Sequence, residues 1–172
     1  MGDPVGVADM PTVHLICGLT GAGKTTFARK LAAECEGLRF SIDEWMAALF
    51  AADAPEPLTF EWAIERVGRC EDMIWRTGLA ALAAGRDIVL DLGFDTRAQR
   101  DRFRALAEEV GHGVALYHIT APRDARLARV RRRNEDNSET MAFAVTDGMF
   151  EFMENRFEAP APEESPLDHN SD

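Results

Sequence analysis

The sequence predicts an α/β fold in which a parallel sheet of four or five strands carries helices on both faces. Segments rich in β-branched and aliphatic residues alternate with segments of helical periodicity, as in successive strand and helix units. A glycine-rich turn joins the first such strand to the first helix. The 172 residues fit a single domain. We expect a flexible N-terminus over residues 1–11, one domain over residues 12–157, and a solvated, acidic, proline-rich tail over residues 158–172.

The predicted elements follow one another in a regular order. Apolar, β-branched runs predict strands over residues 13–17, 38–42, 87–91 and 114–119. Apolar spacing, capping residues, glycines and prolines predict the helices: residues 24–35, a helix starting in the SIDE motif at 41–44, a long helix ending near Gly85, one ending at 111–113, one after Pro122, and residues 145–157. Ligands of such sheets bind beyond the carboxyl ends of the strands.

The composition argues against several classes of protein. No apolar run is long enough to cross a bilayer, and the N-terminus lacks the features of a secretory signal, so we expect a cytoplasmic protein. The net charge of −11 opposes non-specific binding to nucleic acid, because phosphate contacts need a basic surface. Cys17, Cys35 and Cys70 show no pairing or metal-ligand spacing, and we expect buried, reduced thiols.

The segment GLTGAGKT has the spacing G-x-x-x-x-G-K-[ST] of a phosphate-binding loop and lies directly between a predicted strand and a predicted helix. Its glycines let the backbone turn tightly and aim N–H groups at phosphate oxygens, and the helix adds its positive end. Only Lys24 and Lys30 are lysines, which makes Lys24 inside the loop conspicuous. The alternative interpretation is a glycine-rich turn that binds nothing.

The loop predicts binding of ATP with Mg²⁺. Lys24 is expected to reach the β- and γ-phosphates, and the Thr25 hydroxyl is expected to bind Mg²⁺. The residues predicted to bind the nucleotide are those of the loop and its flank, together with one arginine beyond it: Gly18, Thr20, Gly21, Ala22, Gly23, Lys24, Thr25, Thr26 and Arg126.

Two carboxylates follow predicted strands. Ser41 and Glu44 have capping-box spacing, which leaves Asp43 free to accept the proton of an attacking hydroxyl or to orient it. Asp91 follows an apolar run, the position of an acidic residue that orients Mg²⁺ or its water, and it is the second candidate for the base. The alternatives are a helix-dipole contact for Asp43 and an ordinary strand-terminal turn for Asp91.

An arginine-rich helix follows the fourth predicted strand. Arg126, Arg129 and Arg133 recur at helical spacing and share one face, which predicts a small lid that closes over the phosphates. Arg129 and Arg133 are the predicted catalytic arginines, although such a run is most often a solvated face. Arg97 and Arg100 are expected to touch the acceptor instead.

These motifs resemble those of the small P-loop kinases that include polynucleotide kinase, chloramphenicol phosphotransferase and the zeta toxins. The resemblance covers about residues 12–160 and rests on GLTGAGKTTFARKLA, SIDEW, VLDLGF and the run RLARVRRRN after APRD. The ending VTDGMFEFMENRFEAPAPEE also resembles bacterial members known only as AAA-family ATPases or predicted kinases. The resemblance implies a three-layer kinase-like P-loop NTPase fold. It also implies phosphate and Mg²⁺ binding by Lys24 and Thr25, a general base at Asp43, and a lid arginine at Arg129 or Arg133.

No acceptor signature of those kinases is present, so none of their substrates carries over. The favoured hypothesis is an ATP-dependent phosphotransferase that acts on a hydroxyl of a small molecule. A 5′-hydroxyl kinase of RNA or DNA is the second hypothesis, which the arginines permit and the net charge opposes. The third is an ATPase switch without an acceptor. No membrane partner is expected, and the sequence does not define an oligomeric state.

Overall fold

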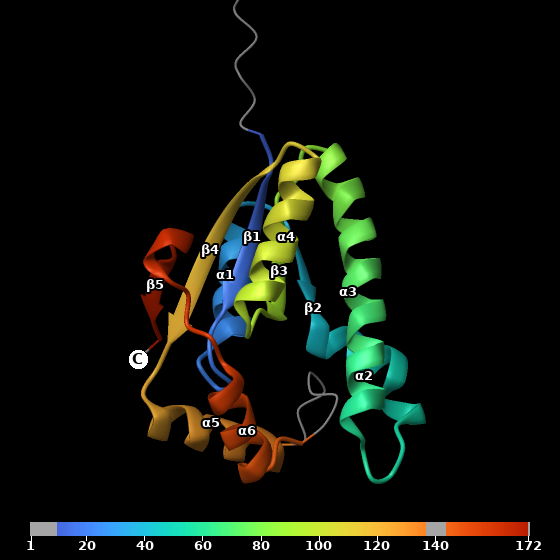
Figure 1. The fold of residues 1–172 in the computed structure, drawn as a ribbon, viewed down its shortest axis with the longest axis vertical. Helices are drawn as coiled ribbons and strands as arrows, with labels where there is room; N and C mark the ends of the chain where they lie inside the picture. Colours follow the sequence, from blue (N-terminus) through green and yellow to red (C-terminus); the bar gives the residue numbers. More distant parts are fainter. Residues whose placement is uncertain (1–9, 137–143, 172) are drawn as a thin grey trace, which may run out of the picture.

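The computed structural model describes residues 10–136 and 144–171, which form a five-stranded parallel sheet. The strands are β1 (Thr12–Cys17), β2 (Leu38–Ser41), β3 (Ile88–Gly93), β4 (Gly113–Thr120) and β5 (Leu167–Asn170). Their order across the sheet is β2-β3-β1-β4-β5 (Figure 1). All four pairings are parallel. The predicted α/β class is confirmed, and the four predicted strands agree with β1 to β4 within two residues.

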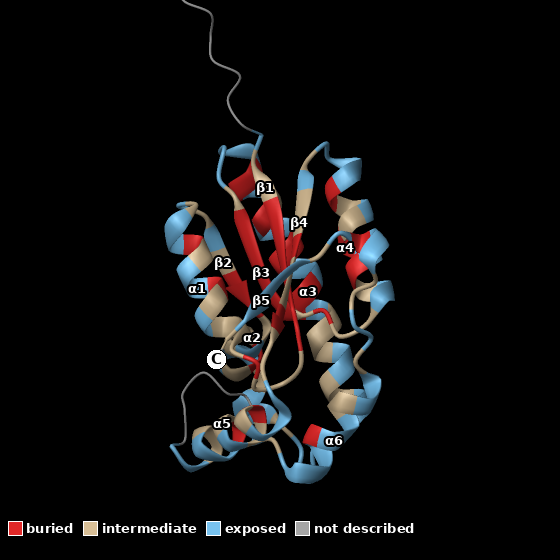
Figure 2. Ribbon diagram, turned by 90° about the vertical axis from the view of Figure 1, so that its left-hand side faces the viewer, coloured by how far each residue is buried: buried red, intermediate tan, exposed pale blue. Residues whose placement is uncertain are grey.

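Helices cover both faces of the sheet, as Figure 2 shows edge-on. Helix α1 (Lys24–Glu34) lies on one face, and α3 (Phe60–Ala83) and α4 (Arg97–Glu109) lie on the other. Helix α2 (Ile42–Phe50) joins β2 to the 3-10 turn η1 (Ala51–Asp53). Helices α5 (Arg123–Glu135) and α6 (Asp147–Arg156) pack together beyond the carboxyl ends of the strands (Figure 1). Helix α5 carries Arg126, Arg129 and Arg133, the three arginines of the predicted lid.

Alternation along the central strand divides the core into two hydrophobic clusters. Val13, Leu15 and Cys17 point toward α3 and α4, whereas Ile16 belongs to the cluster under α1. Each of these four side chains is fully buried, and burial of a large aliphatic side chain stabilises the fold by about 1.5–3 kcal/mol. This packing fixes the strand register, which places the ends of β1, β2 and β3 side by side.

The C-terminal segment differs from the solvated tail that we predicted. It forms the 3-10 turn η2 (Pro162–Glu164) and then β5, which pairs with β4 from Tyr117 opposite Leu167 to Thr120 opposite Asn170. Glu164 accepts hydrogen bonds from the buried Arg100 at 2.7 and 3.0 Å. The prediction was wrong because the strand LDHN has no apolar alternation, and its order comes from partners far away in the sequence.

No helix of the described residues is long and apolar enough to cross a membrane. All three cysteines are free. Cys17 and Cys70 are buried as predicted, whereas Cys35 is only half-buried, because it caps the carboxyl end of α1 near the protein surface.

Candidate active site

The phosphate-binding loop leaves the carboxyl end of β1 and enters α1. Gly18, Gly21 and Gly23 have φ angles of +148°, +79° and +96°, a region that favours glycine. A Cβ atom on Gly18 would lie 2.2 Å from the carbonyl oxygen of Ile119, and one on Gly21 would lie 2.5 Å from that of Arg126. These glycines therefore also let the loop pack against the end of β4 and against α5.

The ammonium group of Lys24 lies against the backbone of the phosphate-binding loop. Its Nζ donates hydrogen bonds to the carbonyl oxygens of Gly18 at 2.6 Å and Leu19 at 3.2 Å. Thr25 and Thr26 follow in the first turn of α1, the first half-buried and the second exposed. The loop thus has the strand, turn and helix arrangement that its motif predicts.

Asp43 begins the first full turn of α2, immediately beyond the end of β2. The Ser41 hydroxyl accepts a hydrogen bond from the Glu44 backbone N–H at 3.4 Å, which confirms half of the predicted capping box. The Glu44 carboxylate does not complete it, because it pairs with Arg29 and Arg39 instead. The cap on the helix is therefore supplied by Ser41, and Asp43 has no part in it.

Desolvation and four nearby charged groups affect the pKa of Asp43. Its side chain is exposed, yet the protein around it displaces much of its water, and this desolvation raises the pKa of the carboxyl group. The negative charges of Asp91 and Asp95 act in the same direction, and the positive charges of Lys24 and Arg133 oppose them. The structure therefore brings the predicted base, loop lysine and one lid arginine into electrostatic range of one another.

Asp91 is a buried residue within β3 and not the turn residue of the alternative interpretation. It lies opposite Ser41 of β2, and its Oδ2 accepts a hydrogen bond from Arg39 Nη1 at 3.2 Å. Arg39 thus neutralises part of the negative charge of Asp91, the carboxylate that we predicted to hold Mg²⁺. Asp95 is a third carboxylate at this edge that the sequence analysis missed, and its only local signal was its position directly after VLDLGF.

Two of the three lid arginines, Arg126 and Arg129, donate hydrogen bonds to backbone carbonyl oxygens of the phosphate-binding loop. Arg126 is 3% exposed and donates to the carbonyl oxygens of Ala121 at 3.1 Å and Thr20 at 3.4 Å. It also pairs with Glu154 of α6. This arrangement differs from the direct nucleotide contact that we predicted for Arg126, because its donors are used within the protein.

Arg129 and Arg133 differ in how their guanidinium groups are paired. Arg129 donates to the carbonyl oxygens of Gly21 at 3.3 Å and Ser171 at 2.8 Å. The Ser171 hydroxyl donates in turn to the Ala22 carbonyl oxygen, a contact between residues 149 positions apart that no local pattern indicates. In contrast, Nε of Arg133 is buried without a hydrogen-bond partner among the described residues. Arg133 is thus the lid arginine with unused donor capacity beside Asp43.

The predicted acceptor role of Arg97 and Arg100 is not supported by their positions. Arg100 is fully buried and donates to Glu164 and to the carbonyl oxygens of Phe94 and Glu158. Arg97 pairs with the exposed Glu163 at 2.6 Å. Both arginines hold the C-terminal segment, because their position at the start of α4 faces that segment.

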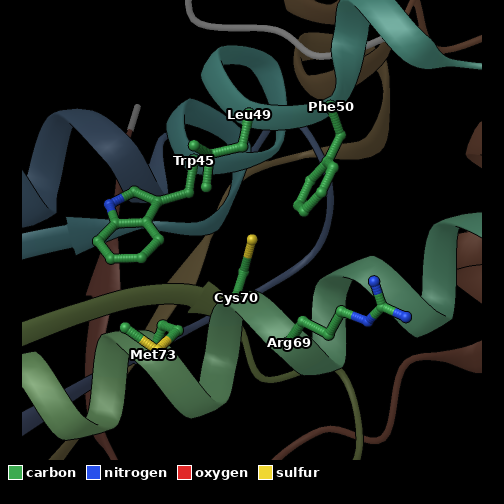
Figure 3. Close-up of a pocket in the computed structure, with 6 residues that line it drawn as sticks. All are labelled: Trp45, Leu49, Phe50, Arg69, Cys70 and Met73. Carbon is green, nitrogen blue, oxygen red and sulfur yellow. The ribbon is translucent and has the colours of Figure 1, made fainter.

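An apolar hollow lies between α2 and α3. Figure 3 shows Trp45, Leu49 and Phe50 of α2 above Cys70 and Met73 of α3, with Arg69 at its edge. At 100° per residue, Trp45 and Leu49 lie on a different face of α2 from Asp43, whereas Phe50, seven residues after Asp43, lies on nearly the same face. Most of the α2 lining of this hollow therefore faces away from Asp43, and only its Phe50 end shares the face of the carboxylate.

Comparison with known proteins agrees with this geometry. Residues 13–160 match the family described as AAA domain. A curated guanylate kinase from Chromohalobacter salexigens is 24% identical over 164 residues, which cover 86% of this chain and 74% of that protein. A candidate kinase structure from Chloroflexus aurantiacus aligns with a TM-score of 0.77 at 17% identity, over 95% of this chain and 89% of that one.

A gluconokinase from Sinorhizobium meliloti aligns with a TM-score of 0.62 at 16% identity, over 94% of this chain and 82% of that one. At such identities the structural likeness shows a shared fold. The family match covers most of the chain, including the loop, Asp43, Asp91 and the lid arginines. The chain therefore belongs to the AAA domain family and has the α/β fold of the small P-loop kinases.

Proposed function

We propose that this protein transfers the γ-phosphoryl group of ATP to a hydroxyl of a small-molecule acceptor. The observation that carries the proposal is the position of Asp43, an exposed carboxylate in electrostatic range of Lys24 and Arg133. A carboxylate beside two cations, at the strand edge next to a phosphate-binding loop, suits a base for an attacking hydroxyl. Nucleotide-dependent phosphotransfer is also consistent with the family match.

The residues of this chain divide the reaction between them. Lys24 leaves the loop carbonyls to contact the β- and γ-phosphates, and Nε of Arg133, which has no hydrogen-bond partner within residues 10–136 and 144–171, donates to the γ-phosphate. Asp43 accepts the proton of the acceptor hydroxyl while the oxygen of that hydroxyl forms a bond to the γ-phosphorus. The bond from that phosphorus to the bridging β–γ oxygen breaks, and ADP leaves with the electron pair.

The residues present also fit Mg²⁺. Thr25 and the carboxylates of Asp91 and Asp95 lie at the same edge of the sheet, and hydroxyl and carboxylate oxygens are the ligands that Mg²⁺ prefers. Thr25 would bind the ion directly, and Asp91 would hold it or one of its waters with the oxygen that Arg39 does not use. When bound, Mg²⁺ neutralises charge that develops on the phosphate oxygens.

Two lysine variants test the loop. Lys24→Ala removes the phosphate contact, and calorimetric titration is expected to show loss of ATP binding. Lys30→Ala is the matched control, because Lys30 is the other lysine, lies on the same helix and makes only an exposed contact with Glu34 at 3.7 Å. Equal ATP affinity in the two variants would refute the role of this loop.

The transfer step is tested by ADP release with a panel of acceptors. The panel contains sugars and other small hydroxyl compounds, nucleoside monophosphates and 5′-hydroxyl oligonucleotides, so that the competing acceptors are included. Asp43→Asn keeps the shape of the side chain and is expected to lower transfer by about a hundredfold or more with near-normal ATP affinity. Asp53→Asn, in the exposed turn after α2, is the control. Transfer at the normal rate by Asp43→Asn would exclude this base and leave Asp91 as the next candidate.

A further inference from the structure

A second cluster of chemically active side chains lies at the amino ends of β1 and β3, whereas the loop lies at the carboxyl end of β1. His14 comes from the start of β1, Asp87 directly precedes β3, and Cys35 caps the carboxyl end of α1. One donor atom from each, a ring nitrogen, a thiol sulfur and a carboxylate oxygen, lie within 4.8 Å of one another. The proposed phosphotransfer uses none of these residues.

We propose that His14, Cys35 and Asp87 bind one divalent metal ion of the zinc type. Nitrogen, sulfur and oxygen donors together suit an ion of intermediate softness, and Zn²⁺ takes this set in tetrahedral sites. Bonds of about 2.0–2.3 Å place the ligand atoms of such a site about 3.3–3.6 Å apart. Nε2 of His14 and Oδ2 of Asp87 are 3.0 Å apart, and all three donor atoms lie within 4.8 Å of one another, so side-chain rotation is needed to bring them to that spacing.

The surroundings of His14 match those of a metal ligand. His14 is 7% exposed, and its Nδ1 lies 3.3 Å from the hydroxyl of Tyr117. When Nε2 binds the ion, Nδ1–H donates to this hydroxyl, and such a partner fixes the ring orientation of metal-bound histidines. Asp87 is likewise held, because its Oδ1 accepts the Thr12 backbone N–H at 2.9 Å while Oδ2 faces His14.

Binding of the metal ion releases one proton, and the ion can reach the ligands from solvent. The thiol of Cys35 gives its proton to solvent as the sulfur–metal bond forms, and the His14 ring exchanges one protonated nitrogen for the other, so one proton is released. Cys35 and Asp87 are both half-buried, which allows the ion to enter and a water to take the fourth position. The site would join α1, β1 and β3 without touching the nucleotide. The inference therefore does not rest on the proposed function.

Co²⁺ titration of the reduced, chelator-treated, full-length protein tests the proposal. A thiolate-bound Co²⁺ gives a strong near-ultraviolet charge-transfer band, whereas Co²⁺ held by the active-site carboxylates does not. We expect one equivalent of Co²⁺ to produce the band and one equivalent of Zn²⁺ to abolish it. Absence of the band from the wild-type protein would overturn the proposal.

Matched variants assign the ligands. Cys35→Ser is expected to lose the band, while Cys70→Ser, which removes a buried thiol from α3, keeps it. Asp87→Asn preserves the acceptor for Thr12 and is expected to bind Zn²⁺ at least tenfold more weakly, with circular dichroism reporting whether the fold is retained. A band of wild-type intensity in Cys35→Ser, or unchanged Zn²⁺ affinity in a folded Asp87→Asn protein, would contradict the site.

Discussion

Replacing Glu164 with glutamine should destabilise the fold strongly, because it leaves the charge of Arg100 buried without a counter-charge. Arg100 is fully buried, and Glu164 accepts two of its hydrogen bonds, at 2.7 and 3.0 Å. Removing one partner of such a pair costs about 3–5 kcal/mol. For a domain of this size, that loss lowers the melting temperature by about 6–20 °C. Urea unfolding and calorimetry at neutral pH measure both quantities.

The neighbouring residue supplies the control. Glu163 also pairs with an arginine of α4, but both side chains of its pair with Arg97 are about half exposed. Exposed pairs contribute about 0–1 kcal/mol, so Glu163→Gln should change stability little. If Glu164→Gln were as stable as Glu163→Gln within about 0.5 kcal/mol, the account of the C-terminal segment as a structural element would be refuted.

The same pair has a defined pH dependence. The hydrogen bonds from Arg100 lower the pKa of Glu164 from 4.5 to about 2. Because the folded pKa is depressed, this contribution to stability is complete above about pH 4.5 and is lost as the pH falls toward 2. The stability difference between the wild-type protein and Glu164→Gln should therefore shrink over that interval. A difference that stays constant would contradict the assigned cause.

Three further predictions concern the active site and the thiols. Arg133→Leu should lower the transfer rate by about a hundredfold with little change in ATP affinity, whereas Arg132→Leu on the exposed side should not, and steady-state kinetics distinguishes them. The rate should fall with acid at a higher pH than for an ordinary aspartate, because desolvation raises the pKa of Asp43 and the protonated form accepts no proton, and a flat pH profile would exclude this base. Thiol labelling of the native, metal-free protein should modify the half-buried Cys35 first and Cys17 slowest, because burial raises the pKa of Cys17 to about 12.

Local patterns were sufficient to predict four strands of the sheet and the loop. Hydrophobic periodicity located β1 to β4, because a buried strand needs a continuous apolar run wherever the sheet is covered on both faces. The loop motif placed Lys24 and Thr25 correctly at the start of α1, since its glycines determine the turn locally. Ser41 likewise began α2 through a contact with a residue three positions away.

Contacts between distant residues could not be predicted in this way. The buried partner of Arg100, Glu164, lies 64 residues further along the chain. No local pattern connects the two residues, and the sequence therefore suggests an acceptor contact for Arg100 instead. Strand β5 escaped detection because it is polar and exposed, and its order comes from pairing with the edge of β4. The metal-ligand spacing of Cys35 was also invisible, since His14 and Asp87 approach it only through the fold.

The placement of Arg133 on α5 is linked to the burial of Arg126. Seven residues are about two helical turns, so the two side chains project from nearly the same face of α5. Arg126 is fixed by Glu154 of α6 and by the Thr20 carbonyl oxygen of the loop, and its guanidinium lies 5.2 Å from the Phe150 ring. These contacts set the rotation of α5 about its axis. Arg126 thus acts as a positioning residue, and under the proposed function Arg133 reaches a phosphate only in the rotation that Arg126 imposes.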